Sequence, residues 1–217
     1  MVGPHAGAGV VSTARDEVLR RVRAANAGAQ ERGTERSYRT SGENSAGSPA
    51  VVDLLEDRLV DYKATVRRCV EADLRSTVAD ALSAATEDGG RVVVPPGLPE
   101  AWAPTGIHDD GTLTPADLDQ FAAVVTACTV ACAETGTIAL DGSADQGRRA
   151  ITLVPDVHIC VVRADQVVET VPEMLARVEA TRPVTFVSGP SATSDIELDR
   201  VEGVHGPRTL VVVIVTT

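Results

Sequence analysis

The chain has 217 residues, an ordinary size for one globular domain. It carries 31 acidic residues against 20 basic ones, a net charge of −11, and only 2% of its residues are aromatic. A surface with this charge repels nucleic-acid phosphates and anionic lipid heads, so we expect neither partner. No apolar run reaches the ~20 residues of a membrane-spanning helix, and the first residues lack the pattern of a signal peptide. We therefore expect a cytoplasmic protein without a membrane span.

A short amphipathic helix is predicted near the N-terminus, over residues 13–29. Its apolar positions recur at helical spacing, Thr13 can cap it, and Asp16 and Glu17 stand where the helix dipole favours acids. Residues 30–49 are polar and rich in Gly, Ser and Arg, which predicts a mobile linker. The sequence is thus divided into an N-terminal helix with its linker, residues 1–50, and a main domain, residues 51–217.

Helical and extended patterns alternate in the main domain. Helices are predicted over residues 54–62 and 74–82, and strands over residues 64–70 and 92–94. This order is typical of a right-handed parallel crossover, so we predict an α/β fold: a Rossmann-like, mostly parallel sheet with helices on both faces. Residues 97–116 are rich in Pro and Gly and hold Asp109 and Asp110, which form either solvated surface or a lid beside a ligand. A short helix is expected to start at residue 117.

The four cysteines show no CxxC pair, and only Cys128 and Cys132 have a spacing found in metal sites. A zinc or iron–sulfur site needs three or four ligands in a tight framework, and the other ligands are not nearby in the sequence. We interpret the cysteines as buried free thiols and predict neither a metal nor a cofactor in this chain.

A polar bend, Ala133-Glu134-Thr135-Gly136-Thr137, separates two apolar runs. Its glycine permits close backbone approach, and a glutamate at a buried bend is costly without a partner. The bend is either a tight turn whose threonines satisfy backbone groups or part of a site. His158, at the start of a strand predicted over residues 157–163, is likewise a structural histidine, a proton carrier or a ligand.

The most polar segment lies between two apolar runs near the C-terminus. Residues 184–187 and 210–215 are β-branched and bounded by Gly and Pro, which predicts two fully buried strands. The segment between them must emerge at a sheet end, where ligands bind in open α/β sheets. Its hydroxyls and amides, before an expected short helical segment, favour a carboxylate or phosphate, and Arg149 can add a forked donor. The residues proposed here to bind a small anionic ligand are Arg149, Ser188, Gly189, Ser191, Thr193, Asp195 and Glu197, with Thr135, Gly136 and Thr137 from the bend.

Four segments together resemble one family: AETGTIAL at residues 133–140, LVPDVHICVV at 153–162, FVSGPSATSDIE at 186–197 and GVHGPRTLVVVIV at 203–215. They resemble the LUD domain family of lactate utilization proteins, over about residues 51–217. The resemblance implies a fold like that of ribose-5-phosphate isomerase, glucosamine-6-phosphate deaminase and family I CoA transferases. It also implies a part in the oxidation of L-lactate to pyruvate beside partner proteins that hold iron–sulfur clusters.

Three functions stay open at this stage. In the first, the protein is a cluster-free accessory subunit of the lactate-oxidising system. In the second, it is a stand-alone enzyme of the phosphosugar-isomerase or CoA-transferase type, with Glu134 as nucleophile or base and His158 or His205 moving protons. In the third, His158, His205, Asp195 and Glu197 bind a metal. The candidate catalytic residues are therefore Glu134, His158 and His205.

Overall fold

The computed structural model describes residues 13–29, 37–86, 90–194, 200–202 and 205–216, with only the backbone described in 192–194 and 200–202. The chain forms two compact units, Met1–Tyr38 and Arg39–Thr217. The helix of the first unit, α1, spans Ala14–Asn26. Thr13 caps it in a reciprocal capping box with Asp16, as predicted.

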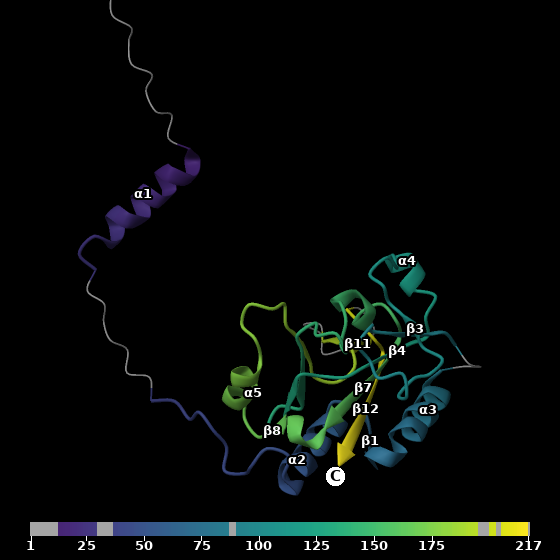
Figure 1. Ribbon diagram of the computed structural model, residues 1–217. Coiled ribbons are helices and arrows are strands. Elements are labelled where there is room, and N and C mark those ends of the chain that lie inside the picture. Colours follow the sequence, from purple (N-terminus) through teal and green to yellow (C-terminus); the bar gives the residue numbers. More distant parts are fainter. Residues whose placement is uncertain (1–12, 30–36, 87–89, 195–199, 203–204, 217) are drawn as a thin grey trace, which may run out of the picture. The chain divides into compact units, whose positions relative to one another are not determined.

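The second unit is built on a six-stranded sheet in which every neighbouring pair is parallel. The strand order is β1-β12-β7-β4-β2-β3. Figure 1 shows these strands with α2 and α3 on opposite sides of them. The strands span Thr65–Val70 (β1), Val92–Val94 (β2), Ile107–His108 (β3), Ala123–Thr126 (β4), Val157–Arg163 (β7) and Thr209–Thr216 (β12). The helices are α2 (Pro49–Asp61), α3 (Leu74–Ala85), α4 (Pro115–Leu118) and α5 (Val171–Arg177), with 3-10 turns η1 (Glu71–Asp73), η2 (Arg149–Thr152) and η3 (Ala164–Gln166).

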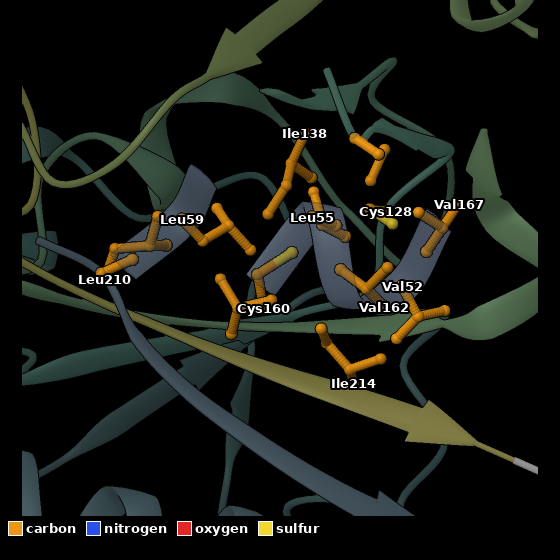
Figure 2. Close-up of a cluster of buried hydrophobic side chains, with 14 of the residues drawn as sticks. Val52, Leu55, Leu59, Cys128, Ile138, Cys160, Val162, Val167, Leu210 and Ile214 are labelled. Atoms are coloured by element: carbon orange, nitrogen blue, oxygen red, sulfur yellow. The ribbon is translucent and has the colours of Figure 1, made fainter. Parts of the chain in front are cut away.

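Helix α2 covers one face of the parallel sheet. Pro49 occupies its first turn, where a missing N–H costs nothing, and Leu55 and Leu59 repeat at helical spacing on the buried side. Figure 2 shows these leucines pointing toward Cys160 and Ile214 of the sheet. Both leucines are 0% exposed, and burying each contributes about 1.5–3 kcal/mol. Helix α3 packs on the opposite face, so the predicted α/β fold with helices on both faces is confirmed.

A second sheet lies on the α2 side and was not predicted. Its order is β8-β5-β6-β9, with β8 parallel and β6 antiparallel to β5, and β9 antiparallel to β6. The prediction that residues 184–187 form a fully buried strand is wrong: this stretch belongs to β9, at an edge of the second sheet, and Phe186 is 50% exposed. An edge strand with one covered face leaves alternate side chains outside. The strands are β5 (Val130–Cys132), β6 (Thr137–Leu140), β8 (Val167–Val168) and β9 (Thr185–Val187).

One further prediction needs correction. The helix expected from residue 117 is the single turn α4, which starts at Pro115 because Thr114 caps it in a box with Asp117. Strands β10 (Ala192–Ser194) and β11 (Arg200–Glu202) pair in an antiparallel ribbon. The short helical segment expected beyond the loop over residues 188–195 would begin in residues 195–199, which lie outside the described residues. No helix among the described residues has the length and apolar character needed to cross a bilayer.

Candidate functional site

A small cavity, here called the histidine cavity, lies over the amino ends of β7 and β12. Its volume is about 270 Å³. It brings together six residues proposed from the sequence, although they come from three separate segments: Arg149, His158, Ser188, Gly189, Ser191 and His205. The cavity is therefore at the opposite edge of the parallel sheet from the carboxyl ends, where ligands of open α/β sheets usually bind.

His158 stands at the base of this cavity. It is the second residue of β7, pairs in register with Leu210 and Val124, and is only 2% exposed. Its Nε2 lies 2.8 Å from Oγ1 of Thr126 on β4, within hydrogen-bond distance. Burial lowers the pKa of His158 to about 4, because a charged imidazolium is disfavoured away from water. At neutral pH the ring is therefore an uncharged hydrogen-bond partner.

Arg149 supplies positive charge to the cavity. It opens the 3-10 turn η2, and its side chain is exposed. Within the described part of the chain, its guanidinium makes no hydrogen bond and no ion pair. A guanidinium keeps its charge at all physiological pH values and offers paired N–H donors to a carboxylate. Arg149 is thus available to bind an anion.

The loop after β9 forms another wall. The hydroxyls of Ser188 and Thr137 lie 2.8 Å apart, and Thr135 donates to Thr137 at 2.8 Å. Ser191 accepts a hydrogen bond from the backbone N–H of His205 at 3.1 Å, and its own N–H donates to the carbonyl of Pro207 at 2.8 Å. Ser191 therefore ties the two loops together, while Ser188 connects the cavity to the polar bend.

Gly189 has a steric reason to be glycine. Its φ is +80°, in the left-handed region, and a Cβ atom there would lie 2.6 Å from the backbone oxygen of Tyr62. Both facts exclude a side chain at this position without movement of the loop or of the chain that follows α2.

Glu134, Thr135 and Gly136 line neither of the two cavities described here. The side chain of Glu134 is 33% exposed and forms an ion pair with Arg39, so its position is less buried than the sequence suggested. Gly136, with φ +59°, packs against Arg58 of α2. These three residues hold the turn between β5 and β6.

The remaining predicted residues are Thr193, Asp195 and Glu197. The backbone of Thr193 lies in β10, and nothing is described of its side chain. Asp195 and Glu197 lie outside the described residues. Across the described ranges, no three His, Cys, Asp or Glu side chains gather closely enough to hold a metal ion. All four cysteines are free, and three of them are buried.

A larger cavity, here called the arginine cavity, was not predicted as a whole, although Asp109 and Asp110, for which the sequence left open a place beside a ligand, both line it. Its volume is about 640 Å³. Arg148 donates to both oxygens of Asp109, at 2.6 and 3.0 Å, and to the carbonyl of Leu113 at 2.6 Å. On the other side, Arg182 donates to Asp141 at 3.2 Å and to the hydroxyl of Ser143 at 2.8 Å.

Asp141, on one side of the arginine cavity, is stabilised in its charged form. Burial alone would raise the pKa of Asp141, but hydrogen bonds from Ser143 and the positive charge of Arg182 contribute to lowering it below its ordinary value. The adjacent Arg148-Arg149 pair and the polar loop over residues 141–146 were the sequence signals that could have located this cavity.

The fold and these cavities define an α/β domain with two adjoining hollows that share Arg149, which has no partner among the described residues, and one of which also holds the neutral His158. The family model of the LUD domain matches residues 101–215, and the chain belongs to this family. It is 51% identical over 172 residues to lactate utilization protein C of Deinococcus radiodurans, a match that covers 76% of this chain and 79% of the relative.

More distant and structural relatives agree with this family. Lactate utilization protein C of Bacillus subtilis is 34% identical over 91 residues, 38% of each chain. A crystal structure of a DUF162 family protein from Deinococcus radiodurans is similar with a TM-score of 0.64 and 42% identity, covering 76% of this chain and 96% of that one. The α/β architecture described above is therefore shared with a solved structure.

Proposed function

We propose that the protein takes part in lactate utilization, as the component without iron–sulfur clusters in a system that oxidises L-lactate to pyruvate. The observation that carries this proposal is the 51% identity to a lactate utilization protein C, which extends over most of both chains. Oxidation of lactate to pyruvate releases two electrons and two protons. In this proposal the electrons pass to clusters held by partner proteins.

The histidine cavity is the proposed binding site for the acid itself. Arg149 is the residue that would bind the carboxylate, because it has charge and forked donors and no partner among the described residues. The hydroxyl of Ser188 and the neutral ring of His158 would then face the hydroxyl or keto oxygen next to that carboxylate. A volume of about 270 Å³ corresponds to about nine water molecules at ~30 Å³ each, which is room for a three-carbon acid with some water.

No specific observation favours the alternative function, a stand-alone enzyme of the isomerase or transferase type. Its proposed nucleophile, Glu134, is paired with Arg39 and does not line the histidine cavity. A catalytic carboxylate must come within hydrogen-bond reach of the reacting atoms. We therefore place the binding of a small acid, and not covalent catalysis by Glu134, at the centre of the proposal.

Isothermal titration of the full chain with L-lactate and with pyruvate tests the binding site. Arg149→Gln should weaken binding about tenfold or more, because a hydrogen bond to a charged group contributes about 1.5–3 kcal/mol. Arg75→Gln is the matched control: it removes an equal charge from an exposed position of α3, outside both cavities. The proposed site is refuted if the unaltered chain binds neither acid, or if the two variants bind them equally well.

A further inference from the structure

The arginine cavity lies where the connections of the parallel sheet diverge. Strands β4 and β2 are neighbours in the sheet order β7-β4-β2-β3. From β2 the chain continues to β3, on the side away from β4, and from β4 it continues to β7, on the side away from β2. The gap between the carboxyl ends of β4 and β2 is therefore a topological switch point. In open α/β sheets, ligands bind in the crevice at this point.

The loop over residues 143–147 is attached to both of these strand ends. The N–H of Gly97, which follows β2, donates to the carbonyl of Ala144 at 2.8 Å. The N–H of Ala127, which follows β4, donates to the carbonyl of Asp145 at 3.0 Å. Ser143, Ala144 and Gly147 of this loop line the arginine cavity. One wall of the cavity is thus fixed at the switch point by backbone hydrogen bonds.

The charges of this cavity select for a ligand with a single negative group. Arg148 is paired with Asp109, whose side chain is 3% exposed, and Arg182 with Asp141, whose side chain is 7% exposed. These pairs cancel in charge and orient the guanidinium groups. Arg149 also lines this cavity and adds one positive charge without a partner in the described chain, while the exposed Asp110, bonded to Thr112, adds one negative charge. A ligand with several negative groups would meet the carboxylates as well.

The other polar groups of the wall match hydroxyls. The wall presents guanidinium and serine donors beside carboxylate acceptors, including Asp110 at the rim. A hydroxyl group both donates and accepts, so it can bond to either kind of partner. Apolar side chains such as Leu140 and Val184 also line this cavity, so an unsubstituted hydrocarbon chain would contact them but would offer no hydrogen bond to the polar groups of the wall.

The two cavities share Arg149, Thr152 and Thr185 as lining residues. From this shared wall we infer that they form one two-part site for a hydroxylated monocarboxylic acid longer than lactate, with its carboxylate at Arg149 and its hydroxylated chain in the arginine cavity. This inference rests on the proposed function for the carboxylate position. The 640 Å³ of the arginine cavity lies within the ~300–1,000 Å³ usual for ligands of that size, whereas the 270 Å³ of the histidine cavity does not.

Titration of the full chain with D-gluconate, hexanoate and L-lactate tests the inference. Gluconate has six carbons and five hydroxyls, and hexanoate has the same chain length without them. We expect gluconate to bind about tenfold more tightly than either other acid. Arg182→Gln should remove this advantage and leave lactate binding unchanged. Ser143→Ala replaces it as the test variant if Arg182→Gln does not fold.

The outcomes separate the inference from the proposed function. If lactate binds but gluconate binds no more tightly, the two-part site is overturned and the lactate site stands. If hexanoate binds as tightly as gluconate, or if gluconate keeps its advantage over lactate in the folded variant, the hydroxyl-matching wall is overturned. If none of the acids binds, both proposals fail together.

Discussion

The neutrality of His158 gives a pH dependence of stability that can be calculated. Burial lowers the pKa of this side chain from 6.5 to about 4 in the folded protein. Between these values the unfolded chain holds a proton that the folded chain does not, so stability falls as the pH decreases through this window. The stabilising effect is complete above about pH 6.5 and is lost as the pH falls toward 4. At about 1.4 kcal/mol per pH unit, the loss is on the order of 3 kcal/mol.

Urea unfolding followed by the fluorescence of Trp102, the one tryptophan of the chain, measures this effect. The free energy of unfolding should fall more steeply between about pH 6.5 and pH 4.5 in the unaltered protein than in His158→Gln. The carboxylates titrate in both proteins and cancel in the difference. Thr126→Val is the control, because it removes the hydrogen bond to His158 but keeps the ring buried, and it should retain the steep dependence. Equal slopes for the unaltered protein and His158→Gln would refute a buried neutral histidine.

Two further predictions concern stability. Arg148→Met should lower the free energy of unfolding by about 2 kcal/mol, because it leaves the buried Asp109 without its charged partner. Arg208→Met breaks an equally forked but exposed pair with Asp156, so it should lower the free energy of unfolding by less than about 1 kcal/mol. Equal losses in urea titrations would contradict the role given to burial. Gly189→Ala should cost about 1–3 kcal/mol, because of the positive φ and the close backbone oxygen; an unchanged melting temperature would show that the loop accommodates the methyl group.

Local sequence patterns correctly predicted the elements whose conformation depends mainly on residues within the element itself. The strand over residues 157–163 was predicted with the bounds that β7 has, because a β-branched run without breakers favours extended backbone. The cap at Thr13 was likewise predictable, since it depends on residues within one turn. The short strands β5 and β6 were not recognised as a second sheet. Three or four apolar residues do not reveal which sheet they join.

The candidate site was predictable only in part. The polar loop after residue 187, with Arg149 and His158, lines one cavity, as expected if polar residues at strand ends converge. The arginine cavity was not assembled from the sequence because only its segment over residues 141–149 carries a local signal, and this segment is distant in the sequence from Asp109 and Arg182. Glu134 was grouped with the site from its bend, but its partner Arg39 is 95 residues away in the sequence. Ion pairs between residues so far apart in the sequence depend on the tertiary packing of the chain, and the spacing of apolar residues does not reveal this packing.

Affinity purification of the native protein from cells grown on L-lactate tests whether it works together with iron–sulfur proteins. The eluate is analysed for protein identity, for iron and acid-labile sulfide, and for reduction of a dye by L-lactate. We expect iron–sulfur proteins with cysteine cluster motifs, present in constant ratio to the chain, and dye reduction that needs them. A chain that purifies alone and free of iron, and whose deletion does not affect growth on L-lactate, would show that the protein has no part in such a system.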